Sequence, residues 1–155
     1  MNEHADFNRV FVAGDSAGAT LTHYVVRQSG VQGVSGVSIA GIVLFHPFFR
    51  NEEPSKLLKV IYPTGGGLDD PIVCPGKDPK LGSLGAKRVL VFVAEKDFLK
   101  DRGWIYYEAL KKSGWGGAVE IEETEGEEHV FHLFNPSCEK AVSLVKKAAA
   151  FMNQE

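Results

Sequence analysis

A serine between two glycines ends the first apolar run of the sequence, in the stretch RVFVAGDSAGA. Ser16 stands at the centre of this pattern, with Gly14 and Gly18 two residues away on either side. A serine on a sharp turn between a strand and a helix projects its hydroxyl above the edge of a sheet, and glycines suit the flanking positions because the turn is too tight for side chains. We therefore predict that Ser16 is a nucleophile.

The residue after this serine has a predicted role of its own. The N–H of Ala17 would lie at the N-terminus of the following helix, where unpaired donors and the helix dipole stabilise a developing oxyanion. Leu21, Val25 and Val26 then repeat with helical spacing. The alternative is a chance serine turn, but the strand before it and the helix after it favour the nucleophile.

A serine hydroxyl needs a base to remove its proton and a carboxylate to orient that base. The apolar run RVLVFVAEKDFLKDRG supplies carboxylates directly after a strand, at the edge where open α/β sheets gather their sites. We select Asp97 as the acid, with Glu95 as the second choice, and expect Asp101 to cap or precede the next helix. The alternative for Asp97 is an ordinary turn residue at the end of a strand.

Five histidines compete for the role of the base. We select His129, because it follows an acidic, glycine-containing loop in the segment EGEEHVFHLF. His132 lies among apolar residues, so we expect it to pack or to support the site. His46 is expected to make a structural hydrogen bond, His23 to lie inertly on the surface of a helix, and His4 precedes the first strand.

The same segment allows a metal site as an alternative. His129 and His132 could bind an ion together with Glu127 or Glu128, but no third ligand has a recognisable spacing. We therefore expect neither a metal nor a cofactor.

The composition is that of one globular domain covering residues 1–155, with 44% hydrophobic and 24% charged residues. A formal net charge of −3 gives no electrostatic reason to expect nucleic acid or an anionic membrane as a partner.

The first ten residues lack the pattern of a secretion signal, and no apolar run approaches the roughly 20 residues that span a bilayer. Cys74 and Cys138 show no metal-type spacing. We expect a cytoplasmic protein.

Strands that alternate with helices must position the chemical groups. The predicted strands cover residues 9–13, 41–45, 88–94 and 118–122. The first three are apolar on both faces, which favours a mostly parallel sheet with helices on both faces. The predicted helices cover residues 17–28, closed by Gly30, residues 103–112, and a segment that begins at Asn135 and Pro136.

Residues 50–87 interrupt this alternation. Five of the seven prolines and three consecutive glycines fall in this range. We predict an irregular excursion that forms a lid or a pocket wall, and a merely solvated loop is the alternative.

Three segments together carry a resemblance to a known family: HADFNRVFVAGDSAGA, RVLVFVAEKDFLKDRGWIYYEALKKSGW and GEEHVFHLFNP. The combination resembles the plant carboxylesterases of the hormone-sensitive-lipase-like α/β-hydrolase superfamily, to which gibberellin receptors and 2-hydroxyisoflavanone dehydratases also belong. The resemblance implies an α/β-hydrolase fold, with Ser16 as nucleophile, Asp97 as acid and His129 as base.

The resemblance also implies an incomplete fold. The family places a His-Gly-Gly-Gly loop before the serine to complete its oxyanion hole, and this sequence has none there. Since the family domain is about twice as long, we expect the C-terminal portion of a partial α/β-hydrolase fold, with the N-terminal half of the fold missing. The strand over 9–13 would then lie at an open sheet edge that is available for self-association.

The function that these observations favour is a carboxylic ester hydrolase that acts on a small-molecule ester through an acyl-enzyme. The alternatives are a non-catalytic, hormone-type receptor, a dehydratase on the same scaffold, and an inactive fragment.

Overall fold

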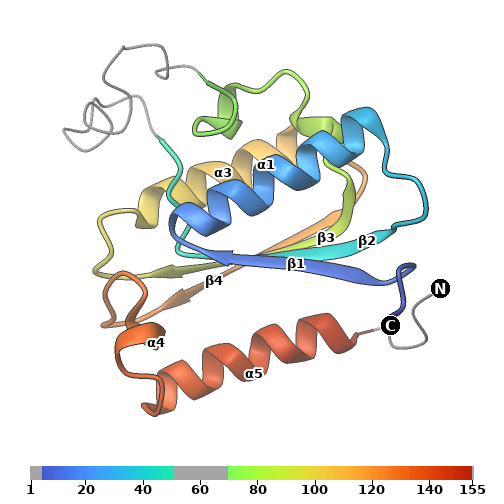
Figure 1. The fold of residues 1–155 in the computed structure, drawn as a ribbon. Coiled ribbons are helices and arrows are strands. Elements are labelled where there is room, and N and C mark those ends of the chain that lie inside the picture. The colour runs from blue at the N-terminus through green and yellow to red at the C-terminus, as the bar shows by residue number, and fades with distance from the viewer. Residues whose placement is uncertain (1–4, 51–69, 155) are drawn as a thin grey trace.

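The computed structural model describes residues 5–50 and 70–154, which form a sheet with helices on both faces (Figure 1). The strands are β1 (Val10–Asp15), β2 (Ile39–Phe45), β3 (Ala86–Ala94) and β4 (Ala118–Thr124). They lie in the order β1-β2-β3-β4, and each neighbouring pair is parallel. The parallel sheet predicted from the sequence is confirmed. Each strand extends beyond its predicted range at one end, and β1 begins one residue later than predicted.

The helices divide between the two faces of the sheet. Helices α1 (Ala17–Gln32) and α3 (Lys100–Lys112) cover one face, and α5 (Glu139–Asn153) covers the other (Figure 1). Along β2, the side chains of Ile42 and Leu44 pack into the core under α1 and α3, whereas Val43 packs into the core under α5. This alternation explains why the central strands are apolar on both faces.

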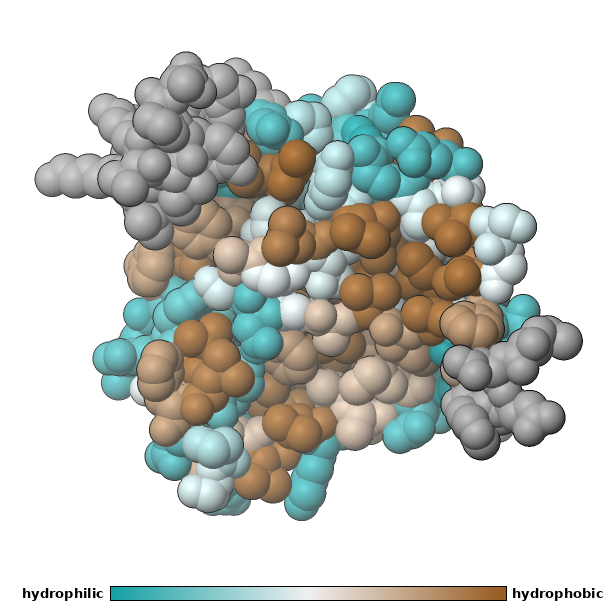
Figure 2. All heavy atoms as spheres, in the orientation of Figure 1, coloured by the Kyte–Doolittle hydropathy of each residue, from teal (hydrophilic) through white to brown (hydrophobic). Residues whose placement is uncertain are grey.

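Strand β1 is an edge strand of the described sheet, as predicted, and pairs only with β2 there. Figure 2, drawn in the orientation of Figure 1, shows hydrophobic side chains gathered along α1 and over β1. On α1, Leu21 is 61% exposed and Val25 is 56% exposed. Self-association through this edge stays a prediction.

Helix α1 is longer than predicted and does not end at Gly30. Its C-cap is Gly33, which has φ +73°. Gly30 lies inside the helix, where an added Cβ would collide with the backbone at Ser83 and Gly85. This glycine therefore allows the close approach of another segment rather than a helix end.

Helix α5 begins later than the predicted start at Asn135 and Pro136. Cys138 caps it, with Sγ accepting the N–H of Ala141 at 3.4 Å. Asn135 instead ends the short helix α4 (Phe131–Phe134), which was not predicted, and donates its N–H to the carbonyl of Phe131 at 2.9 Å.

The described part of the predicted excursion is packed rather than open. Residues 70–85 contain two single-turn 3₁₀ helices, Pro75–Lys77 and Leu81–Ser83, and bury the side chains of Val73 and Leu84. Residues 51–69 lie outside the described residues, so the lid or pocket-wall role stays a prediction. Among the described helices, none has the length and apolar character needed to cross a membrane.

His23 is buried, so its predicted surface position is wrong. It is 1% exposed, and its Nδ1 lies 3.1 Å from the hydroxyl of Tyr106 on α3. His23 falls on the same stripe of α1 as the fully buried Ala19 and Val26, at spacings of four and three residues. That spacing is the sequence signal that marks it as a core residue.

The burial of His23 makes the stability of the fold depend on pH. Burial lowers the pKa of His23 from 6.5 to about 4, so between these values the unfolded chain binds a proton that the folded chain does not. We expect the free energy of unfolding to fall as the pH is lowered from about 6.5 to about 4, with His23 contributing about 3 kcal/mol of that loss. Urea titrations across this pH range measure it.

Two matched variants distinguish the titration of the His23 ring from the effect of its hydrogen bond with Tyr106. His23→Gln should reduce the slope by the His23 contribution and leave the part due to His46, whose pKa burial also lowers to about 4. Tyr106→Phe removes the hydrogen-bond partner of His23 and should keep the full slope. An unchanged slope in His23→Gln would contradict this assignment.

Candidate active site

Ser16 occupies the tight turn between β1 and α1. Its backbone has φ 53° and ψ −118°, a strained conformation for a residue with a side chain. The turn is held against the end of β2, because the Ser16 N–H donates to the carbonyl of Phe45 at 2.8 Å and the Ser16 carbonyl accepts the N–H of Phe48 at 3.1 Å. These bonds keep the hydroxyl in one place above the sheet edge.

The two flanking glycines serve different purposes. A Cβ on Gly14 would collide with the backbone of Gly18 and would approach Oγ1 of Thr22 to 2.8 Å, so the turn requires glycine there. A Cβ on Gly18 would meet no described atom within 4 Å. The prediction that tightness demands both glycines is therefore confirmed for Gly14 and wrong for Gly18.

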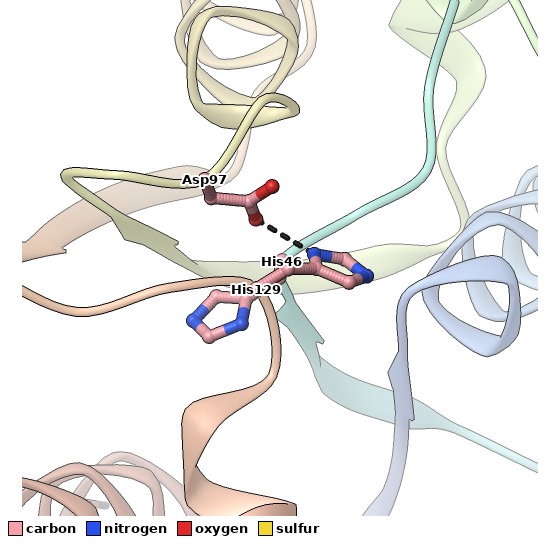
Figure 3. A group of neighbouring side chains, drawn as sticks. All are labelled: His46, Asp97 and His129. Carbon is pink, nitrogen blue, oxygen red and sulfur yellow. Dashed lines mark hydrogen bonds and ion pairs between the residues drawn. The ribbon is translucent and has the colours of Figure 1, made fainter.

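The structure brings together the predicted nucleophile, base and acid. His129 Nε2 lies 2.9 Å from Ser16 Oγ, and His129 Nδ1 lies 2.7 Å from Asp97 Oδ2. Figure 3 shows the Asp97 carboxylate aimed at the His129 ring. Because a carboxylate only accepts, Nδ1 carries the hydrogen and Nε2 is free to accept the serine proton.

Asp97 is fixed on the turn that follows β3. The residue is 6% exposed, and its other oxygen, Oδ1, accepts the N–H of Leu99 at 2.8 Å. Glu95, the second choice for the acid, points elsewhere and accepts the N–H of Gly126 at 2.6 Å. Asp101 lies inside the first turn of α3, because the helix begins at Lys100 rather than at residue 103 and Leu99 is its N-cap. The expectation that Asp101 caps or precedes the helix is therefore wrong.

His46 makes the structural hydrogen bond that the sequence suggested. It is fully buried at the end of β2 with φ 47°, and its Nδ1 accepts the N–H of Val130 at 2.7 Å. Burial is the largest cause that lowers the pKa of His46 to about 4. The ring is therefore neutral at physiological pH and able to accept this bond.

His132 contacts the turn that carries Ser16. Its Nε2 lies 2.7 Å from Oδ1 of Asp15, and its ring packs against Phe45 with 5.2 Å between ring centroids. The expectation that His132 packs or supports the site agrees with this placement. Its contact with Asp15 was not foreseen. His4 lies outside the described residues.

The predicted metal alternative is not assembled. Among residues 5–50 and 70–154, the group of three candidate ligands is His46, Asp97 and His129, with ligand atoms within 4.8 Å of one another (Figure 3). Both nitrogens of His129 are already hydrogen-bonded, and His46 Nδ1 accepts from Val130. An ion bound through those atoms would displace these bonds, so the arrangement fits proton transfer better.

The surroundings of His129 offer an oxyanion donor and apolar surface. Ala17 is the first residue of α1, so its N–H has no partner within its own helix and lies at the positive end of the helix dipole. The ring of Phe98 is 69% exposed and lies 5.6 Å from the His129 ring. Phe134, 84% exposed, helps line a cleft of about 430 Å³ beside His129.

Comparisons with known proteins show the family to which the chain is related. Residues 1–133 match the sequence pattern of a protein family described as alpha/beta hydrolase fold. Probable carboxylesterase 2 of Arabidopsis thaliana is 39% identical over 99% of this chain and 54% of its own length. The 2-hydroxyisoflavanone dehydratase of Glycyrrhiza echinata is 37% identical over 97% of this chain and 51% of its own length.

A solved structure has a similar fold. A thermostable carboxylesterase cloned from a metagenomic library superposes with a TM-score of 0.78 and 26% identity, over 96% of this chain and 55% of that one. The resemblance to plant carboxylesterases is thereby confirmed. The chain spans about half the length of the curated relatives that it matches.

The contrast between the two glycines is directly testable. We expect Gly14→Ala to lower the free energy of unfolding by about 1–3 kcal/mol, because the new methyl group overlaps fixed backbone atoms. Gly18→Ala, the matched control in the first turn of α1, should leave stability unchanged or raise it by up to about 1 kcal/mol. Chemical denaturation of both variants measures the difference, and equal effects would contradict it.

Proposed function

This chain belongs to the alpha/beta hydrolase fold family, and on that premise we propose that it is a carboxylic ester hydrolase acting through Ser16, His129 and Asp97. One observation carries the proposal: a continuous path of hydrogen bonds runs from the serine hydroxyl through the imidazole to the carboxylate, over 2.9 and 2.7 Å. A hydroxyl with this support is a nucleophile for acyl transfer.

The first half of the reaction transfers the acyl group to the protein. Ser16 Oγ attacks the carbonyl carbon of the ester while its proton passes to His129 Nε2. The tetrahedral intermediate then collapses, the bond to the alcohol oxygen breaks, and His129 returns the proton to the leaving alcohol. An acyl-serine remains.

The second half releases the acid. A water molecule gives a proton to His129 Nε2 and attacks the acyl carbon, and the bond to Ser16 Oγ then breaks as the serine recovers a proton from the imidazole. Asp97 stays ionised throughout. It holds the ring with Nδ1 protonated and stabilises the imidazolium that forms in each half.

The N–H of Ala17 is the oxyanion donor that we assign from this chain. It lies next to the nucleophile at the start of α1, where the negative charge on the carbonyl oxygen would develop. One such donor is typically worth about 10²- to 10³-fold in turnover.

The substrate that fits this site is a small ester with an apolar group. Phe98 presents an exposed ring beside His129, so an apolar acyl or alcohol group would lose water against it.

Two further functions use the same scaffold. A non-catalytic receptor has no need for an imidazole held between a serine and a carboxylate, so the geometry favours an enzyme. The relative named 2-hydroxyisoflavanone dehydratase makes dehydration the second candidate. There His129 would remove a proton from carbon and return it to the hydroxyl group that leaves as water, while a carbon–carbon double bond forms and Ser16 does not become acylated.

A fluorophosphonate probe tests the nucleophile. We expect covalent labelling of the full chain at Ser16, because the probe reacts with serines that have an activating base. Labelling should be lost in Ser16→Ala and kept in Ser143→Ala, a control at an exposed serine. A folded chain that is not labelled would contradict the hydrolase.

The choice between the two carboxylates is tested by paired substitutions. Asp97→Asn should lower kcat for a p-nitrophenyl ester by about 10³- to 10⁴-fold, because the amide disfavours the tautomer with Nδ1 protonated. Glu95→Gln keeps an acceptor for the Gly126 N–H and should change kcat by less than about threefold. Similar losses in both variants would contradict the assignment of Asp97.

A further inference from the structure

The loop that carries His129 must cross the whole described sheet to reach Ser16. It leaves the end of β4, whereas Ser16 follows β1, and these strands lie at opposite ends of the order β1-β2-β3-β4. Three steps between neighbouring strands amount to about 14 Å. The distance between His129 and Ser16 therefore depends on what holds the loop along its path.

The end of β3 provides the first anchors of this loop. The Glu95 carboxylate accepts the N–H of Gly126 at 2.6 Å, and the N–H of Lys96 donates to the carbonyl of Glu127 at 2.9 Å. These contacts fix the part of the loop that precedes His129.

The ends of β2 and β1 provide the next two anchors, on the far side of His129. His46 accepts the N–H of Val130, which has φ 47°. Beyond it, His132 Nε2 lies 2.7 Å from Oδ1 of Asp15. This last contact is the one that reaches the strand of the nucleophile, since Asp15 directly precedes Ser16 in sequence.

We propose that the contact between Asp15 and His132 is a tether that sets the distance and orientation of His129 relative to Ser16. The inference rests on the proposed function and adds a positioning residue on each side of the site. His132 does not contact the reacting atoms; it acts through the short segment that joins it to His129.

The tether is rigid at one end and accessible at the other. His132 is 8% exposed and is packed between the rings of Phe45 and His46, at centroid distances of 5.2 and 5.4 Å. The Asp15 side chain is 37% exposed. The imidazole therefore has little freedom to move, and substitution of Asp15 removes the contact while the core stays packed.

The contact between Asp15 and His132 affects the rate through the position of His129 rather than through the strength of the bond itself. A displacement of about 1 Å in a reacting group can cost about 10²-fold in rate. Without the tether, the loop beyond Val130 keeps its packing on the sheet but loses its direct link to the nucleophile turn. Removal of the tether should then lower kcat, while substrate binding is maintained.

A double-mutant cycle on the full chain tests this tether. We expect Asp15→Ala and His132→Phe each to lower kcat for a p-nitrophenyl ester by about 10- to 100-fold, with KM changed by less than about threefold. The double variant should be no slower than the slower single variant, because both substitutions remove the same contact. Each kcat is normalised to the amount of chain that a fluorophosphonate labels to completion, so that unfolded protein does not enter the comparison.

Conservative variants separate positioning from general stability. Asp15→Asn keeps an acceptor oxygen and His132→Gln keeps an N–H donor, so each should recover most of the lost kcat. Glu123→Ala, the control, removes contacts with Lys100 and Trp104 between β4 and α3 and should leave kcat unchanged.

The outcomes distinguish the two proposals. If the unsubstituted chain is neither labelled nor active on esters, the proposed function is wrong. If it is active and the Asp15→Ala and His132→Phe variants keep their kcat, or lose it additively, the tether is wrong and the proposed function stands.

Discussion

The parallel pairing of the strands is the constraint on which the site depends. It places the ends of β1, β2 and β3 side by side, with Asp15 opposite Phe45 and Phe45 opposite Phe92. Groups that are far apart in sequence therefore emerge at one edge: Ser16 after β1, and Asp97 after β3. The sheet can supply this common edge because apolar side chains on both of its faces are covered by helices.

Backbone strain is concentrated at this same edge. Within the described residues, positive φ outside glycine occurs at Ser16, His46 and Val130, and all three adjoin the proposed reacting groups. Each is held by a hydrogen bond through its own N–H, to the carbonyl of Phe45, to the carbonyl of Phe92 and to the imidazole of His46 respectively. Such conformations persist only where the surroundings fix them, so the packed sheet below stabilises the strained turns above.

The sequence predicted what depends on local pattern. Apolar runs located the strands, and the position of Ser16, Asp97 and His129 after strands predicted that they would meet. Long-range contacts were harder to foresee. Gly30 looked like a helix end because nothing local signals that another segment approaches it, and Asn135 looked like a helix cap because the short helix α4 has no periodicity of its own.

The position of β1 at the border of the described sheet has a consequence for dynamics. Ser16 follows β1, one of the two strands that pair on one side only within the described residues, while β2 and β3 are paired on both sides. Local opening costs least where the fewest neighbours must be released, so β1 and β4 should fray before the interior strands exchange their amide hydrogens. Gentle heating would then separate the Ser16 hydroxyl from the His129 imidazole while the central strands remain folded, so the proposed site would come apart before the fold melts.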